Sequence, residues 1–291
     1  MENVIELKNI YKSYKNFQIE DLSLQVKKGF VTGFIGANGA GKSTVMKLMM
    51  NLIRPDSGEV KMFGMDYSKH EKEIKKRIGF VFDDDILYKE LTLHDMKKLI
   101  APCYKQWQDS LFREYCDRLE LPLNQKMNTF SKGMKMKASL VMALSHQPDL
   151  LIMDEPTAGL DPIVRRQFIE LLQDVMLDEE KTIFLSTHII SDLAPIADFI
   201  TFINSGEIVF SKALHEIEEK YAIVRGSLEL LDRDTEQYFL SIKRTDVGFE
   251  ALTSDYQQIK EVFQDEVIVE KANLEEIMYY SKGGQGNVAF D

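Results

Sequence analysis

The chain has 291 residues, of which 44% are hydrophobic and 29% charged, and its formal net charge is −11 at pH 7. This composition is typical of a soluble globular protein with room for one large domain, or for a domain with an appendage. The acidic balance argues against nucleic acid as the main partner, because binding to phosphate backbones depends on Lys and Arg.

The sequence predicts neither a membrane span nor a secretory leader. Its most apolar run, HIISDLAPIADFITFI, contains two aspartates and a proline, whereas a helix that crosses a bilayer needs about 20 predominantly apolar residues. The N-terminal MENVIELKNIYKSY lacks the apolar core of a signal peptide. Cys103 and Cys116 have no metal-ligand spacing, which favours a reduced, cytosolic setting.

Short strands dominate the N-terminal part of the chain. VIELKNI, DLSLQV and FVTGFIG predict three strands, and TVMKLMMNLI has the apolar spacing of a helix. Two further strands are expected at 59–64 and 77–82, with a charged helix between them. Glu71 and Glu73 interrupt the lysines of that helix, so we interpret it as a solvated face rather than a basic binding patch.

Residues 92–120 change to a helical pattern and predict an insertion between two groups of strands. After it we expect a helix from about Ser131 to Ser145, the strand DLLIMD, a helix from about Asp161 and the strand KTIFLS. A short helix and the strand pair DFITFI and GEIVF complete this part. Alternating strands and helices predict a parallel sheet that is covered on both faces.

From about Ala213 the pattern loosens. Acidic helices, LHEIEEK and NLEEIMYY, alternate with the candidate strands YAIVRG, QYFLSIK and EVIVE. We expect a small C-terminal α+β region that ends in a flexible tail, SKGGQGNVAFD. The chain is therefore divided into a domain of residues 1–215 and an accessory region of residues 216–291.

A glycine-rich loop between a predicted strand and a predicted helix carries the strongest chemical signal. GANGAGKS (36–43) matches G-x-x-x-x-G-K-[ST], in which backbone N–H groups and a helix N-terminus hold phosphate oxygens. Lys42 would reach the β- and γ-phosphates of ATP, and the Ser43 hydroxyl would bind Mg²⁺. The expected ATP-binding residues are Gly36, Ala37, Asn38, Gly39, Ala40, Gly41, Lys42, Ser43 and Thr44.

Two carboxylates end the apolar run LLIMDEP (150–156). They are expected at the carboxyl end of a central strand, where ligands of such sheets bind. Asp154 would be the partner of Mg²⁺, and Glu155 would be the base or water-positioning residue for attack on the γ-phosphate. Taken alone, the same run could also be a buried strand that simply ends at a turn.

Together, these motifs resemble those of the nucleotide-binding subunits of ABC (ATP-binding cassette) proteins, over roughly residues 3–215. FSKGMK (130–135) stands at the place of the family's signature, and TAGLD (157–161) at that of the loop after the acidic strand. THII (187–190) contains the switch histidine, His188. The resemblance also places Tyr14 where the family has an aromatic ring that stacks on adenine.

The resemblance implies an α/β P-loop NTPase fold with a mixed β-sheet core and an antiparallel β subdomain. It also implies a helical subdomain at about 85–130 and a small C-terminal α+β appendage.

The resemblance further implies that two chains pack head to tail with ATP between them. The signature of one chain would contact the ATP of the other through Ser131, Lys132, Gly133 and Met134. Asp161 would couple the two sites, and His188 would hold the γ-phosphate and the attacking water in line.

Two departures from the family pattern stand out. Lys132 and Met134 replace a Gly and the Gln of the usual signature, and similar forms are familiar from bacterial ABC-2-type exporters. Asp83 stands where the family has a glutamine that contacts Mg²⁺ and senses the membrane partner. An aspartate can still bind Mg²⁺, so the expected metal ligands are Ser43, Asp83 and Asp154.

The function implied is that of an ATPase motor on the inner face of the cell membrane, cytoplasmic and peripheral. It would act with separate transmembrane permease subunits and a second ATP-binding subunit, either a copy of this chain or a sister ATPase. The helical insertion would dock the permease. The cargo would be an amphipathic or antimicrobial peptide, an antibiotic or a lipid, with a peptide toxin of the phenol-soluble-modulin kind as the favoured example. The alternatives are a soluble ABC ATPase of ribosomes, DNA or Fe–S assembly, and a regulator that hydrolyses little ATP.

Overall fold

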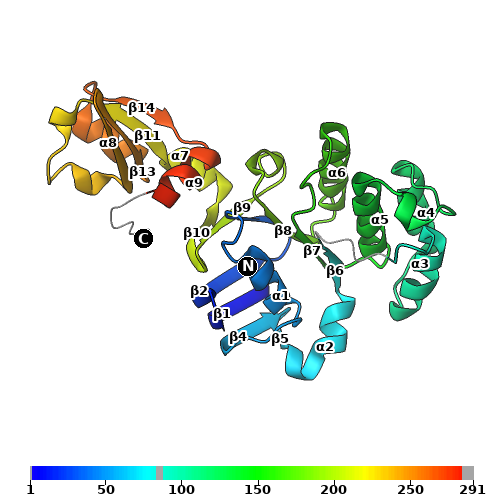
Figure 1. The fold of residues 1–291 in the computed structure, drawn as a ribbon. Coiled ribbons are helices and arrows are strands. Elements are labelled where there is room, and N and C mark those ends of the chain that lie inside the picture. The colour runs from blue at the N-terminus through cyan, green and yellow to red at the C-terminus, as the bar shows by residue number, and fades with distance from the viewer. Residues whose placement is uncertain (1, 83–87, 284–291) are drawn as a thin grey trace.

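The structure is a computed structural model that describes residues 2–82 and 88–283. Within these ranges the chain forms three four- to six-stranded sheets and the helices that cover them (Figure 1). The α-helices are α1 (Lys42–Met49), α2 (Tyr67–Lys76), α3 (Leu93–Ile100), α4 (Asp109–Arg118), α5 (Lys132–Leu144), α6 (Pro162–Val175), α7 (Leu214–Lys220), α8 (Tyr256–Phe263) and α9 (Leu274–Gly283). The 3-10 helices are η1 (Ala101–Cys103), η2 (Met127–Thr129), η3 (Ile190–Asp192), η4 (Leu228–Leu230) and η5 (Glu236–Tyr238).

The first sheet, sheet A, is antiparallel and has the order β2-β1-β4-β5. Its strands are β1 (Asn3–Tyr14), β2 (Phe17–Lys27), β4 (Ser57–Met62) and β5 (Met65–Asp66). Along β2 buried and exposed residues alternate, because one face packs on the core while the other meets solvent.

The central sheet, sheet B, has the order β10-β9-β3-β8-β7-β6. Its strands are β3 (Val31–Ile35), β6 (Ile78–Val81), β7 (Leu150–Asp154), β8 (Thr182–Thr187), β9 (Phe199–Asn204) and β10 (Glu207–Ala213). The strands from β9 to β6 are parallel, and β10 is antiparallel to β9. The carboxyl ends of β3, β7 and β8 therefore meet at one edge of the sheet.

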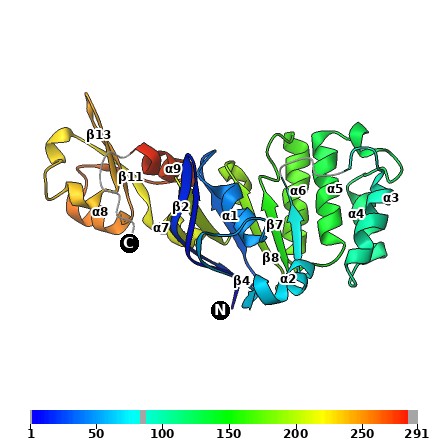
Figure 2. The ribbon, with the colours of Figure 1, turned by 60° about the horizontal axis from the view of Figure 1, so that its bottom comes forward.

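Sheet B is buried on both faces, as the sequence predicts. On β7, Leu150 and Ile152 belong to the core shared with sheet A and α1, whereas Leu151 and Met153 belong to the core shared with α5 and α6. Figures 1 and 2 show β7 and β8 between α1 on one side and α5 and α6 on the other. Burial of each such side chain contributes about 1.5–3 kcal/mol, which explains why the apolar run of this strand is unbroken.

The C-terminal part forms the third sheet, sheet C, with the order β12-β13-β11-β14 and antiparallel pairing throughout. Its strands are β11 (Ala222–Gly226), β12 (Ser241–Thr245), β13 (Gly248–Thr253) and β14 (Ile268–Lys271). In both views sheet C lies at one end of the molecule, and α3 and α4 lie at the opposite end.

The main differences from the sequence-based expectations lie in the C-terminal part. β13 and α8 were not predicted, and the strand expected in QYFLSIK begins only at Ser241, since Gln237 and Tyr238 belong to η5. The tail was expected from Ser281, but α9 continues to Gly283, and residues 284–291 lie outside the described residues. No helix in the described part of the chain has the length and apolar character needed to cross a membrane.

Candidate functional site

The glycine-rich loop connects β3 to α1 and is closely packed on its outer side. A Cβ atom on Gly36 would lie 2.6 Å from the carbonyl oxygen of Ile203, so no side chain fits there. Gly41 caps α1 with a φ of +113° and has no side chain to bond to the first turn. The first N–H groups of the helix are thereby left open to a ligand, as in phosphate-binding loops.

Phe17 is a contact of this loop that the sequence reasoning missed. It begins β2, and a Cβ atom on Gly41 would lie 2.8 Å from its ring. On the partner strand Tyr14 pairs with Phe17 across the β1–β2 turn, and its side chain is 45% exposed. The predicted adenine-stacking residue thus lies on the same hairpin end as the aromatic ring that packs on the loop.

Lys42 turns back into the loop instead of reaching solvent. Its side chain is only 6% exposed, and its Nζ donates hydrogen bonds to the carbonyl oxygens of Gly36 (2.8 Å) and Ala37 (3.2 Å). Nζ also forms an ion pair with Oε1 of Glu155 at 3.0 Å. A buried ammonium group needs such partners because its transfer from water is otherwise very costly.

The two carboxylates of the acidic strand have different surroundings. Asp154, the last residue of β7, accepts a hydrogen bond from the Ser186 hydroxyl at 2.6 Å through Oδ1. The Glu155 backbone N–H donates to both the hydroxyl and the carbonyl oxygen of Ser186, each at 3.1 Å. Glu155 has a φ of +48°, in the left-handed region that non-glycine residues seldom adopt, as strained active-site residues do.

Glu155 joins Lys42 to His188. Its Oε2 accepts a hydrogen bond from the His188 backbone N–H at 3.2 Å and lies 2.7 Å from His188 Nδ1. The side chain of Glu155 is 11% exposed and that of His188 43%. Three residues that the sequence places far apart are therefore in contact at the carboxyl edge of sheet B: a cation from the loop, a carboxylate and an imidazole.

The expected metal ligands are only partly described. Ser43, in the first turn of α1, is exposed, and Asp154 is half-buried. Asp83, with Asp84 and Asp85, lies outside the described residues. Within 2–82 and 88–283 there is no group of three or more His, Cys, Asp or Glu side chains placed to hold a metal ion.

In the structure, Ser131 of the predicted signature and Asp161 each cap the start of a helix, α5 and α6 respectively. Ser131 caps α5 by accepting a hydrogen bond from the Met134 N–H at 3.2 Å. Asp161 caps α6 by accepting from the N–H groups of Ile163 and Val164. These caps satisfy N–H groups of the first helical turn, so each of the two side chains is bonded to the start of its own helix.

The first turn of α5 also packs on the loop that precedes α6 and on α6 itself. A Cβ atom on Gly159 would lie 3.2 Å from the Nζ of Lys132, and one on Gly133 would lie 3.1 Å from a methyl group of Val164. Met134 packs against the core. The two departures from the usual signature therefore make contacts within this chain.

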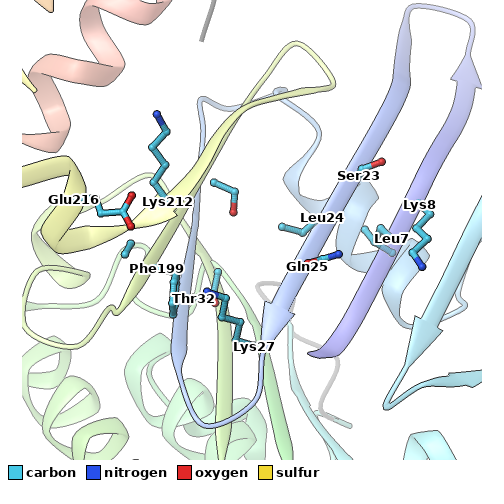
Figure 3. A pocket seen from close by; sticks show the side chains of 12 residues that line it. Leu7, Lys8, Ser23, Leu24, Gln25, Lys27, Thr32, Phe199, Lys212 and Glu216 are labelled. Atoms are coloured by element: carbon cyan, nitrogen blue, oxygen red, sulfur yellow. The ribbon is translucent and has the colours of Figure 1, made fainter. Parts of the chain in front are cut away.

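A separate cavity of about 420 Å³ lies between sheet A and the β9–β10 hairpin. Figure 3 shows Lys212 and Glu216 on one wall and Leu7 and Lys8 on the other. Its lining comes from β1, β2, β3, β9, β10 and α7 and includes no residue of the glycine-rich loop. The cavity is thus distinct from the Lys42–Glu155–His188 group.

Comparison with known proteins gives consistent matches. Residues 19–158 match the family model described as "ABC transporter". The chain is 33% identical over 212 residues to the bacitracin transport ATP-binding protein BcrA of Bacillus licheniformis, which covers 72% of this chain and 69% of the relative. It is also 33% identical over 220 residues to the lantibiotic transport ATP-binding protein SrtF of Streptococcus pyogenes, covering 72% of this chain and 90% of the relative.

A solved structure extends the likeness to the fold. A dimeric ATP-binding cassette in a post-hydrolysis state, bound to ADP and Pi, superposes with a TM-score of 0.64 at 27% identity. The match covers 72% of this chain and 98% of that chain.

Proposed function

Because the chain belongs to the family of ABC transporter ATP-binding proteins, we propose that it is the ATP-hydrolysing subunit of an exporter whose membrane-spanning subunits are separate chains. The observation that carries this proposal is the contact of Glu155 with both Lys42 and His188. It brings a phosphate-binding cation, a carboxylate able to act on water and an imidazole to one edge of sheet B.

ATP binding would exchange one partner of Lys42 for another. The β- and γ-phosphate oxygens compete with Glu155 for the Lys42 ammonium group, which is held within the loop by the carbonyl oxygens of Gly36 and Ala37. The phosphate oxygens also accept hydrogen bonds from the backbone N–H groups at the start of α1. Once Lys42 pairs with phosphate, the Glu155 carboxylate is available to orient a water molecule and accept its proton.

His188 would complete the site from the neighbouring strand. It follows β8 directly, and its backbone and ring nitrogens both contact Glu155. An imidazole held there can donate to the γ-phosphate while the carboxylate holds the water, which fixes the in-line geometry that phosphoryl transfer needs.

Ser43 and Asp154 fit a magnesium ion bound together with ATP. Mg²⁺ is usually held by one or two protein oxygen ligands together with phosphate oxygens and water. The hydrogen bond from Ser186 orients the Asp154 carboxylate, as a supporting partner does for a metal-ligating group. The ion would supply charge neutralisation at the β- and γ-phosphates. The proposed third ligand, Asp83, lies outside the described residues.

Two chains would enclose the nucleotide, as in the head-to-tail dimer that the resemblance implies. Ser131, Lys132, Gly133 and Met134 would contact the ATP held by the other chain, and Asp161 would couple the two sites. Tyr14, exposed at the end of β1, would stack on adenine. The partners are thus a second ATP-binding subunit and a permease at the inner face of the membrane, and we infer a peptide or antibiotic cargo from the transport names of the relatives.

The first experiment compares wild type with two variants. Lys42→Ala is expected to abolish ATP binding. Glu155→Gln should keep ATP binding within a few-fold but lower phosphate release by about 10²-fold or more, because it removes the proton acceptor. Its ATP complex should elute as a dimer in size-exclusion chromatography, whereas Lys42→Ala with ATP stays monomeric. If Glu155→Gln released phosphate at the wild-type rate, the role given to Glu155 would be wrong.

A further inference from the structure

Asp192 is a buried carboxylate that no part of the proposed chemistry uses. It is the last residue of η3, four residues after His188, and it is 3% exposed. Removal of a carboxylate from water costs several kcal/mol unless it is paired and hydrogen-bonded. The groups that pair with the Asp192 carboxylate therefore indicate the structural role of its burial.

The partners of Asp192 come from two other segments. The hydroxyl of Thr157, a fully buried residue, donates to Oδ2 at 2.5 Å. The Nε of Arg165, in the first turn of α6, lies 3.7 Å from Oδ1. One side chain thus joins three segments: the segment that follows His188, the loop that follows Glu155, and the helix capped by Asp161.

The backbone around Thr157 makes this link short. Thr157 lies two residues after Glu155, and the Ala158 N–H donates to the Glu155 carbonyl oxygen at 3.1 Å. On the other side, the Asp192 N–H donates to the Ile189 carbonyl oxygen at 3.3 Å, and Ile189 adjoins His188. The Thr157–Asp192 hydrogen bond therefore links the backbone that follows Glu155 to the backbone that follows His188 within a few residues of each.

The next residue anchors η3 to the sheet. Leu193 is fully buried, and a Cβ atom on Gly33 of β3 would lie 2.7 Å from its Cδ1. η3 is thus fixed against the strand that leads into the glycine-rich loop. Asp192 cannot follow a displaced Thr157 without disturbing this contact.

We propose that Asp192 is a positioning residue for ATP hydrolysis, which holds the Glu155 and His188 segments in register through the Thr157 hydroxyl and Arg165. The inference rests on the proposed function. Asp192 does not belong to the residues that would hold the phosphates, so its loss affects turnover and not nucleotide affinity. Misplacement of reacting groups by about 1 Å lowers rates by about 10²-fold.

Three variants of the full chain test this role: Asp192→Ala, Asp192→Asn and Thr157→Val. For Asp192→Ala we expect kcat to fall about 10- to 100-fold while the Kd for ATP stays within about 3-fold. Asp192→Asn retains an oxygen that accepts from Thr157 and should lose less activity. The matched control is Asp174→Ala on α6, which removes an exposed ion pair with Arg118 and should leave kcat unchanged.

A double variant tests whether Asp192 acts on turnover through Thr157. If Asp192 acts through Thr157, the double variant Asp192→Ala/Thr157→Val should lose no more activity than the worse single variant, since contacting residues are not additive. Three results would overturn the proposal. They are losses of activity that add in the double variant, an unchanged kcat in Asp192→Ala, and equal losses of ATP affinity and turnover in Asp192→Ala. If Asp192→Ala fails to fold, Asp192→Asn and Thr157→Val decide in the same way. A wild-type chain without ATPase activity would contradict the proposed function instead.

Discussion

Tyr221 shows how a single hydroxyl group can work against stability. Its side chain is 1% exposed, and its Oη has no hydrogen-bond partner among the described residues. Burial raises the pKa of this phenol to about 12. Folding therefore removes the hydroxyl from water without replacing its hydrogen bonds, which costs about 1–3 kcal/mol.

We expect Tyr221→Phe to raise the free energy of unfolding by about 1 kcal/mol. Urea unfolding followed by circular dichroism measures the change. Tyr67→Phe is the matched control, because the Tyr67 hydroxyl donates to the Met49 carbonyl oxygen at 2.5 Å, and its removal should destabilise the chain. Destabilisation by both variants would mean that Tyr221 has a hydrogen-bond partner in solution.

For single residues, the sequence predicts which ones belong to the site, but not the direct contacts between residues that lie far apart in the chain. The spacing of Gly36, Gly41 and Lys42 lies within a few residues and is sufficient to predict a phosphate loop. The ion pair between Lys42 and Glu155 joins residues separated by more than a hundred positions, and no local pattern encodes it. Asp192 was missed for the same reason, because a single aspartate after a short apolar run looks like any helix start.

Among the helices, α3 begins with a reciprocal cap. The Thr92 hydroxyl accepts from the Asp95 N–H at 3.1 Å, and the Asp95 carboxylate accepts from the hydroxyl and the backbone N–H of Thr92. The hydrogen bond from the Thr92 hydroxyl, helped by its backbone N–H and by Lys98, lowers the pKa of Asp95 below its ordinary value. This arrangement satisfies N–H groups that a helix start otherwise leaves unpaired.

The stabilisation from this cap should depend on pH. Because the folded-state pKa of Asp95 is lowered, the ionised carboxylate stabilises the folded chain above the unfolded-state pKa of about 3.9, and this contribution is lost as pH falls through the folded-state value. We expect Asp95→Asn to lower Tm at pH 7 and the difference from wild type to shrink below about pH 4. Asp117→Asn on α4, an exposed position, serves as control. A difference that stayed constant down to pH 3 would contradict this account.

β13 was harder to predict than the buried strands of sheet B, whose unbroken apolar runs indicate burial on both faces. Its neighbours β11 and β12 flank it in sheet C, and nearly all of its residues are buried. GFEALT therefore shows no strict alternation of apolar and polar residues, and Glu and Ala favour helices. The strand exists because of its pairing partners, which the sequence does not display.

At the scale of the whole molecule, one end holds the candidate contact region for the permease and the other end holds sheet C. The helical region with α3 and α4 lies far from sheet C (Figures 1 and 2). Leu99 on α3, in this helical region, is 55% exposed. Leu177, which follows α6 and lies outside α3 and α4, is 82% exposed. If the helical region docks the permease, as the family resemblance implies, exposed apolar residues on it contribute to the contact.

We expect the tagged chain, pulled down from detergent-extracted membranes of its host, to bring a multi-span membrane protein with it. Leu99→Glu should lower that recovery several-fold by placing a charge in the contact, while Leu177→Glu should not. Mass spectrometry of the eluate measures both. Recovery of ribosomal, DNA-bound or Fe–S assembly proteins in place of a membrane protein would support the soluble ATPase alternative.

The order of strands in sheet B has a consequence for how the protein is made. β3 leads into the glycine-rich loop, yet its hydrogen-bonded neighbours are β8 and β9, with Val31 beside Ile183 and Thr32 beside Phe199. At a synthesis rate of about 5–20 residues per second, the ribosome needs on the order of ten seconds to produce the chain between them. During that interval the nascent chain holds the complete loop motif without the strands that shape it. Nucleotide capture should therefore begin only when β9 has emerged, so that retention of a stalled nascent chain on ATP-agarose would report the moment at which the central sheet closes.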